Sequence, residues 1–349
     1  MLASFYLNKL LRIKPNNYLC RVNTITQEEI FSIKSHKEFE KLALRVFFHQ
    51  YKHCKVYSDF VTNLGIKPQM IKSIGDIPFL PIEFFKNHQV VSTNNSAEVI
   101  FTSSGTTGTS QSRHLVSDVS WYIKSFRQGF KQFYGNIKDF AFLALLPSYL
   151  EREGSSLIYM IDDLIRESGH SQSGYFLYNH QELFEILQSL KNSKTPTILM
   201  GVTFALLDFI ETYSIDFPEL VIMETGGMKG RRKEMIREEL HAILCEGFGV
   251  PSIHSEYGMT ELLSQAYSLG DGIFHCPAWM KVLVRDTNDP LSILGTGATG
   301  GINVIDLANI NSCSFIATQD LGKLREDGRF EVLGRFDNSD IRGCNLLVQ

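Results

Sequence analysis

The N-terminal part of the chain carries a helical hydrophobic pattern. One face of a predicted helix after Ser35 collects the apolar residues Phe39, Leu42, Ala43, Val46 and Phe47, a spacing typical of an amphipathic helix. Thr26 and Ser35 are each followed three residues later by a glutamate, the pattern of a helix capping box. Two prolines within 77–82 exclude a helix interior there and favour an extended segment. Residues 1–92 are therefore predicted to form a helical region that packs on the core.

The middle of the chain alternates between apolar strand-like runs and helix-like segments. The strand-like runs are 98–101, 141–146, 174–178, 197–201, 220–224 and 252–256, with clear helices at 155–167 and 231–245. Buried strands separated by helices predict an α/β fold of layered, mostly parallel sheets and helices. Ligands of such folds bind at the carboxyl ends of the strands. Residues 93–271 are therefore predicted to form an α/β ligand-binding core.

The pattern changes after residue 271. Short strand-like runs at 281–285, 301–306, 314–318 and 331–333 lie between turns. Closely spaced short strands without intervening helices are typical of a β-rich unit. We therefore expect a smaller β-rich subdomain over residues 272–349.

Composition narrows the classes of partner and compartment. The 349 residues are 44% hydrophobic, which is enough for a large core, and the net charge is -4. Nothing in this composition forces a basic surface, so no nucleic-acid partner is expected. The six cysteines lie far apart without a Cys-x-x-Cys pair, which favours reduced thiols and a cytoplasmic location. The sequence has neither a signal-peptide pattern nor a run of about 18 apolar residues, so no membrane insertion is expected.

A run rich in glycine and hydroxyl groups follows the first strand-like segment of the core. It reads Thr102-Ser103-Ser104-Gly105-Thr106-Thr107-Gly108-Thr109. Glycines let the backbone point successive N–H groups at one spot, and hydroxyls add donors, so such a run can cradle phosphate. It is not a Walker A loop, because that motif needs a Gly-Lys-Ser/Thr ending. Taken alone, such a cluster is more often a plain loop.

Further motifs follow in a fixed order. They are Tyr257-Gly258-Met259-Thr260-Glu261, Thr318-Gln319-Asp320 and Gly334-Arg335-Phe336-Asp337. With the 102–108 run they resemble the AMP-forming adenylate synthetases, a superfamily of acyl-CoA ligases, luciferases and adenylation domains. A closer, nearly end-to-end resemblance is to the acyl-protein synthetases of bacterial fatty-acid reductase complexes. It rests on 77–81, 146–152, 225–232 and Arg342-Gly343-Cys344.

The resemblance implies a reaction. Using ATP and Mg²⁺, the chain would convert a carboxylic acid, expected to be a fatty acid, to acyl-AMP and pass the acyl group to an enzyme cysteine. A partner acyl reductase or another acyl-acceptor protein would then receive it, and a homo- or hetero-oligomer is consistent with this. The implied fold is the N-terminal-type core of the adenylate synthetases, so residues 93–271 would bind the nucleotide.

The resemblance also assigns the nucleotide site. Phosphates would contact Ser103, Ser104, Gly105, Thr106, Thr107 and Gly108. The adenine would be flanked by Gly226, Gly227, Tyr257 and Gly258. Asp320 would take the ribose hydroxyls, and Arg335 would lie near the ribose and phosphate. For each charged residue, the alternative is a solvated or ion-paired surface group.

Two motif residues would act on the reacting groups, and a third would accept the product. Glu261 would bind Mg²⁺ together with the phosphates, and Thr260 would contact the α-phosphate. Cys344 would receive the acyl group, with Arg342 lowering the pKa of its thiol. The alternative for Cys344 is a small buried core residue, which is the commonest fate of a lone cysteine.

The chain departs from the superfamily pattern at several points. Arg113 stands near the position of the usual loop lysine, and we hypothesise that it replaces that cation. Gln319 replaces a glycine, so the local turn is expected to differ. Only a dozen residues follow Asp337, so the large C-terminal lid of other synthetases is expected to be absent, with a partner completing the site. His114 could touch a phosphate or have no role.

Two other functions stay open at this point. The chain could pass the acyl group to coenzyme A or to a carrier protein. It could also be an inactive scaffold or nucleotide sensor with the adenylate fold, since the loop lysine and the lid are missing. The sequence does not fix the length or identity of the acid.

Overall fold

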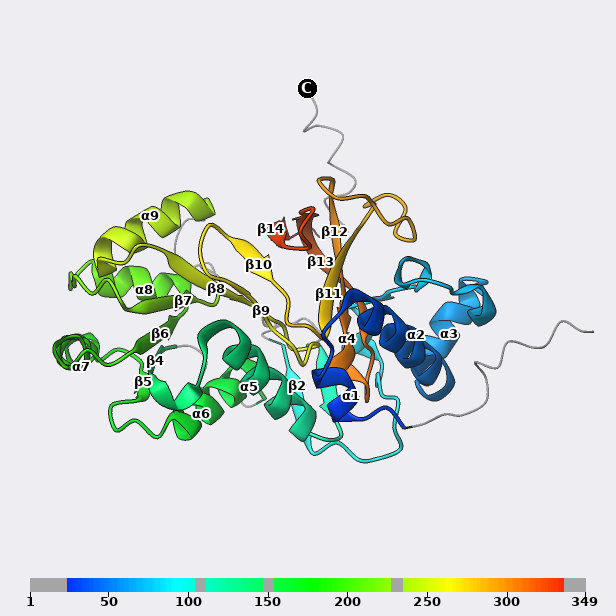
Figure 1. Ribbon diagram of the computed structural model, residues 1–349, viewed down its shortest axis with the longest axis horizontal. Helices are drawn as coiled ribbons and strands as arrows, with labels where there is room; N and C mark the ends of the chain where they lie inside the picture. The colour runs from blue at the N-terminus through cyan, green and yellow to red at the C-terminus, as the bar shows by residue number, and fades with distance from the viewer. Residues whose placement is uncertain (1–23, 104–110, 147–153, 227–234, 336–349) are drawn as a thin grey trace, which may run out of the picture.

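The computed structural model describes residues 24–103, 111–146, 154–226 and 235–335 (Figure 1). Its helices are α1 (Gln27–Phe31), α2 (His36–His53), α3 (Lys55–Asn63), α4 (Phe84–Asn87), α5 (Ser120–Tyr134), α6 (Ser156–Ser168), α7 (His180–Ser193), α8 (Thr203–Ile210) and α9 (Arg237–Phe248). Its strands in the first two thirds are β1 (Leu80–Pro81), β2 (Val99–Thr102), β3 (Arg113–Val116), β4 (Ala141–Leu145), β5 (Gly174–Phe176), β6 (Thr197–Gly201), β7 (Val221–Glu224) and β8 (Ile253–Tyr257). The remaining strands are β9 (Ala266–Ser268), β10 (Ile273–His275), β11 (Met280–Arg285), β12 (Thr299–Asp306), β13 (Phe315–Leu324) and β14 (Phe330–Arg335).

One large mixed sheet organises the described residues. Its twelve strands follow the order β11-β12-β13-β14-β10-β9-β8-β7-β6-β4-β5, and β1 pairs with β13. Strands β4 to β8 pair in parallel, whereas β8 to β14 pair with their neighbours antiparallel. The α/β fold class is confirmed, with parallel strands in the middle of the chain and a β-rich end. The strands of the predicted core and of the predicted β-rich unit share this sheet, and the domain boundaries stay a prediction.

Helices cover both faces of the parallel half of the sheet. Figure 1 shows α8 and α9 on one face and α5 and α6 on the other. Every residue of β4 and β6 is buried, as expected for strands covered on both faces. The carboxyl ends of β7 and β8 therefore form an edge where loops can build a site.

The strand predicted at 98–101 exists, but it lies outside the large sheet. It is β2, and it pairs antiparallel with β3 in a separate two-stranded sheet. The prediction that it belongs to the mostly parallel core sheet is therefore wrong. The physical reason is local, because Arg113–Val116 follows closely enough to return as an antiparallel partner. The residues between these two strands belong to the predicted phosphate run.

The described part of the N-terminal region, residues 24–92, is largely helical. The Thr26 side chain and Glu29 form a reciprocal capping box at α1. Ser35 caps α2 by accepting from the Glu38 backbone N–H, but the Glu38 carboxylate accepts from Lys34 rather than from Ser35. The predicted apolar face of α2 is buried, and in Figure 1 α2 and α3 pack beside β11 and β13.

The proline-rich segment is extended, also as predicted. Leu80 and Pro81 form β1 and pair with β13 opposite Ile316 and Ala317. The hydroxyl of Tyr57 on α3 donates to the Pro78 carbonyl at 2.7 Å. This pairing places α4, the short helix that follows, next to the strand that carries the third motif.

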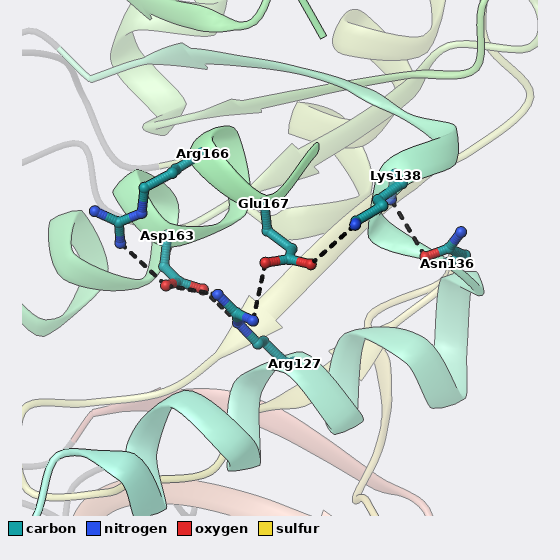
Figure 2. Close-up of polar contacts among 6 residues, drawn as sticks. All are labelled: Arg127, Asn136, Lys138, Asp163, Arg166 and Glu167. Carbon is teal, nitrogen blue, oxygen red and sulfur yellow. Dashed lines mark hydrogen bonds and ion pairs between the residues drawn. The ribbon is translucent and has the colours of Figure 1, made fainter. Parts of the chain in front are cut away.

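An ion-pair network joins α5 to α6 (Figure 2). Arg127 on α5 donates two hydrogen bonds, of 2.7 and 3.0 Å, to the Asp163 carboxylate on α6. Arg127 also pairs with Glu167 at 2.9 Å, and Arg166 contacts Asp163 at 3.1 Å. The Asp163 side chain is only 4% exposed, so this carboxylate depends on its two cationic partners.

Replacing Asp163 with asparagine is expected to lower the free energy of unfolding by about 1–3 kcal/mol, because half-buried Arg127 loses its bidentate partner at a buried carboxylate. Urea unfolding measures this difference. The matched control is Arg166→Gln, whose side chain is 72% exposed and whose loss is expected to cost less than about 0.5 kcal/mol. Equal effects of the two substitutions would contradict this account of the network.

Candidate active site

A cleft of about 1570 Å³ opens at the carboxyl ends of β7 and β8. Its opposite wall is formed by β13 and β14, which bring the third and fourth motifs to the same place. Segments far apart in the sequence therefore meet here. The cleft is lined by the predicted residues Ser103, Gly226, Tyr257, Gly258, Thr260, Glu261, Asp320 and Arg335.

Some predicted site residues are not described by the structure. Ser104, Gly105, Thr106, Thr107, Gly108, Gly227 and Cys344 lie outside the described residues. The two ends of the phosphate run are described. The Ser103 hydroxyl accepts a hydrogen bond from the Ser112 backbone N–H at 3.0 Å, and the Ser103 N–H donates to the Ser112 carbonyl at 3.1 Å. These two hydrogen bonds hold the two ends of the run together beside the cleft.

Asp320 and Tyr257 meet across the cleft. The Tyr257 hydroxyl donates to the Asp320 carboxylate at 2.8 Å. Burial raises the pKa of Asp320, while the Tyr257 hydrogen bond and the charges of Arg335 and Arg285 lower it. Arg335 lies opposite Asp320 in the β13–β14 register. One acceptor, one phenol and one cation therefore stand together where the resemblance places a ribose.

The third motif is not a turn. Thr318, Gln319 and Asp320 all lie within β13. The Gln319 side chain donates to Glu83 at 2.5 Å and accepts from Arg335 at 2.9 Å. The glutamine that replaces the usual glycine therefore holds the Arg335 guanidinium at the edge of the cleft.

Glu261 is a buried carboxylate at the end of the second motif. Glu261 is 4% exposed, and burial raises the pKa of its carboxyl group. The hydrogen bond with the Ser112 side chain and the positive charges of Arg335 and Lys86 act in the opposite direction. A buried carboxylate facing two cationic side chains in a cleft is suited to binding a metal–phosphate complex.

Two residues hold the backbone that carries Glu261. The ring of His114 on β3 contacts the Thr260 carbonyl at 2.8 Å through Nδ1 and Asn309 Oδ1 at 3.1 Å through Nε2. Asn309 donates to the Glu261 carbonyl at 2.8 Å. Burial lowers the pKa of His114 to about 4, so the ring is neutral near pH 7. In the described residues His114 therefore bonds to the second motif.

Arg113, the neighbour of His114, points elsewhere. Arg113 is exposed on β3 and is not among the residues that line the cleft. Its replacement of the usual loop lysine stays a hypothesis. The lining cation that the sequence analysis missed is Lys86 on α4, whose charge acts on Glu261. No spacing along the chain marks Lys86, because the segment that carries it reaches the cleft through the pairing of β1 with β13.

Two carboxylates deeper in the cleft were also missed. Glu224 ends β7 and Glu256 lies near the end of β8, and both line the cleft. Burial and the neighbouring charge of Glu224 raise the pKa of Glu256 from 4.5 to about 7. Glu224 itself accepts a hydrogen bond from the Thr203 hydroxyl at 2.6 Å.

The Glu256 pKa makes stability depend on pH. When the pKa of an acid is higher in the folded state than in the unfolded state, the protein becomes less stable as the pH rises from the unfolded-state pKa to the folded-state pKa. Glu256→Gln removes this charge, so it is expected to raise the free energy of unfolding by about 1–3 kcal/mol near pH 8 and to leave it unchanged near pH 4. Urea unfolding at both pH values tests this, and an equal effect at both would contradict it.

Comparison with known proteins identifies the family. A model of the acyl-protein synthetases, LuxE, matches residues 29–349. The chain belongs to the LuxE acyl-protein synthetase family. The resemblance of the sequence motifs to acyl-protein synthetases is therefore confirmed.

One curated relative and two solved structures illustrate what the chain is similar to. A long-chain-fatty-acid–luciferin-component ligase from Photorhabdus luminescens is 40% identical over 70 residues, which are 20% of this chain and 60% of that protein. ATP-bound MatB from Rhodopseudomonas palustris superposes with a TM-score of 0.52 at 18% identity, covering 70% of this chain and 49% of MatB. A 2-hydroxyisobutyryl-CoA ligase in complex with 2-HIB-AMP gives a TM-score of 0.63 at 12% identity, covering 86% of this chain and 68% of that one. At these identities the neighbours show the fold of adenylate-forming enzymes.

None of the described helices is long and apolar enough to cross a bilayer.

Proposed function

We propose that this LuxE-family chain activates a carboxylic acid with ATP and loads the acyl group onto Cys344. The observation that carries the proposal is the convergence of separate motifs on one cleft. Glu261, Asp320 and Arg335 come from three different strands or loops, yet all line the same cavity. If these three residues were unrelated surface groups, there would be no reason for them to line the same cavity.

The chemistry of acid activation fits this set of groups. A carboxylate oxygen attacks the α-phosphorus of ATP, the new P–O bond replaces the bond to the β-phosphate, and pyrophosphate leaves. Charge develops on the phosphates during this step, and groups that are already oriented toward it stabilise the transition state. Arg335 is positioned for this by its contact with Gln319, and Thr260 by the contact of its carbonyl with His114.

The residues present fit ATP and Mg²⁺. Asp320 would accept hydrogen bonds from the ribose hydroxyls beside Tyr257, and Gly226, with open space where a side chain would start, leaves room for a flat base. Mg²⁺ is usually held by one or two carboxylates together with substrate phosphates, and buried Glu261 supplies one such carboxylate. When bound, Mg²⁺ neutralises charge on the phosphates. The fatty-acid substrate and an acyl-accepting partner are part of the proposal and are supported by the Photorhabdus relative's name.

Transfer to the thiol completes the reaction. The sulfur of Cys344 attacks the acyl carbon, the bond between that carbon and the AMP oxygen breaks, and the thiol proton passes to solvent. Among the described thiols, burial raises the pKa of Cys245 and Cys276, the latter to about 12. Burial also raises the pKa of the other two described thiols, Cys54 and Cys313. Thiols with raised pKa values are poor nucleophiles near pH 7, so none of the four described thiols competes well for the acyl group.

Intact-protein mass spectrometry tests the transfer. The protein is incubated with Mg-ATP and a panel of acids, and a gain of one acyl group that hydroxylamine removes is expected. The adduct is expected to disappear in Cys344→Ala and to persist in the matched thiol variant Cys245→Ala. AMP and pyrophosphate without an adduct would instead support transfer to coenzyme A or a carrier protein. Absence of both products with every acid would support the inactive scaffold.

A further inference from the structure

The cleft has a second polar surface that faces away from the nucleotide residues. Side chains alternate along a strand, so Glu256 and Tyr257 on β8 point to opposite faces. Tyr257 reaches Asp320. Glu256 lies opposite Tyr267 in the β8–β9 register, and its charge raises the pKa of both Tyr267 and Tyr122. Glu256 therefore faces α5, on the side of the sheet away from Asp320.

A buried amide joins Glu256 at this surface. Gln265 lines the cleft and is 5% exposed, and its Oε1 atom has no hydrogen-bond partner. Gly258 lies between the two side chains. A β-carbon at this position would collide with Glu256 Oε1 and would lie 3.3 Å from Gln265 Cγ. The glycine thus leaves space for the Glu256 carboxylate beside the Gln265 side chain.

No described residue neutralises this carboxylate. Within the described part of the chain, no side chain donates a hydrogen bond to Glu256 or forms an ion pair with it, and its charged neighbour is a second carboxylate, Glu224. Leu157 and Met160 of α6 line the cleft nearby, so the surface combines hydrogen-bond acceptors with an apolar wall. An unpartnered buried acceptor is costly, and a ligand that supplies a donor removes that cost.

We propose that Glu256 and Gln265 form an acceptor site for a hydrogen-bond donor on the acyl chain. The preferred substrate is then an acid that carries an amino or hydroxyl group, rather than an unsubstituted fatty acid. This inference rests on the proposed acid activation and names its substrate class. The apolar wall of Leu157 and Met160 contacts the methylene part of such a chain, and the acceptors receive its polar group.

The selectivity follows from whether the acyl chain supplies a hydrogen-bond donor to the oxygen atoms of Glu256 and Gln265. An unsubstituted alkyl chain covers Glu256 and Gln265 without satisfying them, whereas a hydroxyl group can donate to one of these oxygen atoms and an amino group to both. Sites built to hydrogen-bond a substrate group discriminate strongly against the analogue that lacks it. A preference of about tenfold or more is expected for the donor-bearing acid over the unsubstituted acid of equal length.

Calorimetric titration in the presence of a non-hydrolysable ATP analogue measures this preference without requiring turnover. Amino, hydroxy and unsubstituted acids are compared at equal chain length over a series of lengths. The donor-bearing acids are expected to bind more tightly to the wild type, and Glu256→Ala is expected to erase the difference. Glu256→Gln keeps the side-chain shape and removes the charge, so the preference for the amine is expected to fall there too. The matched control is Glu239→Ala, an exposed carboxylate on α9 that does not line the cleft.

Several outcomes would overturn the acceptor site. Unsubstituted acids could bind as tightly as donor-bearing acids, or the preference could survive Glu256→Ala. Weaker binding of the ATP analogue to Glu256→Ala, with acid binding unchanged, would assign this carboxylate to the adenine amino group instead. ATP–pyrophosphate exchange on the same panel separates the two proposals. If unsubstituted acids stimulate exchange as well as donor-bearing acids do, only the acceptor site is contradicted. If donor-bearing acids bind more tightly but no acid stimulates exchange, only the proposed activation is contradicted.

Discussion

Replacing Glu261 with glutamine is expected to reduce acid-dependent ATP–pyrophosphate exchange by about a hundredfold or more. The substitution keeps the size of the side chain and removes the negative charge that faces Arg335 and Lys86 in the cleft. A neutral amide is a poor ligand for Mg²⁺, so a bound metal–phosphate complex would lose the carboxylate that we propose holds it. The variant is expected to fold, because burial already disfavours the charge of Glu261.

Radiolabelled pyrophosphate exchange measures this effect, and thermal unfolding confirms that the variant is folded. Glu326→Gln is the matched control, because Glu326 is exposed in the turn between β13 and β14. Its exchange rate is expected to equal that of the wild type. Exchange by a folded Glu261→Gln variant at the wild-type rate would remove this carboxylate from the reaction.

Replacing Asp320 with alanine is expected to raise the KM for ATP by about tenfold to a hundredfold, with a smaller change in kcat. The carboxylate would bind ribose hydroxyls equally in the ground state and the transition state, and uniform binding of this kind appears in KM. Asp320→Asn keeps an oxygen that accepts the Tyr257 hydrogen bond, so it is expected to have a smaller effect.

Steady-state AMP formation with varied ATP measures both constants. Tyr257→Phe is the matched control, because it removes the hydroxyl that donates to Asp320 and leaves the carboxylate free for ribose. Its KM for ATP is expected to stay within a few-fold of the wild-type value. An unchanged KM in Asp320→Ala would show that the nucleotide binds elsewhere.

The repeating patterns of the sequence predict the main elements well. The helical spacing of apolar residues and the capping pattern at Ser35 predict α2, and the two prolines predict the extended β1. The alternation of strands and helices predicts β4, β6, β7 and β8 and the ligand edge at their carboxyl ends. These features depend on neighbouring residues, which the sequence shows directly.

Features that depend on distant residues were missed. One missed feature is local, because strand β2 pairs with β3, which follows closely in the chain, rather than with the large sheet. His114 contacts the Thr260 carbonyl from 146 residues away in the chain, and Asn309 donates to the Glu261 carbonyl from 48 residues away. Lys86 and Glu256 join the site only because the sheet brings β13 beside β1 and β8 beside β7. Their roles follow from tertiary contacts that spacing along the chain does not contain.

The central claim is that a carboxylate oxygen attacks the α-phosphorus of ATP in this cleft. The most direct test uses an acid labelled with heavy oxygen in its carboxylate, followed by mass analysis of the nucleotide product. Attack at the α-phosphorus leaves one labelled oxygen on AMP when the acyl group moves to a thiol or to water, and this is the predicted result. Unlabelled AMP, or the label in inorganic phosphate with ADP as the nucleotide product, would contradict the account.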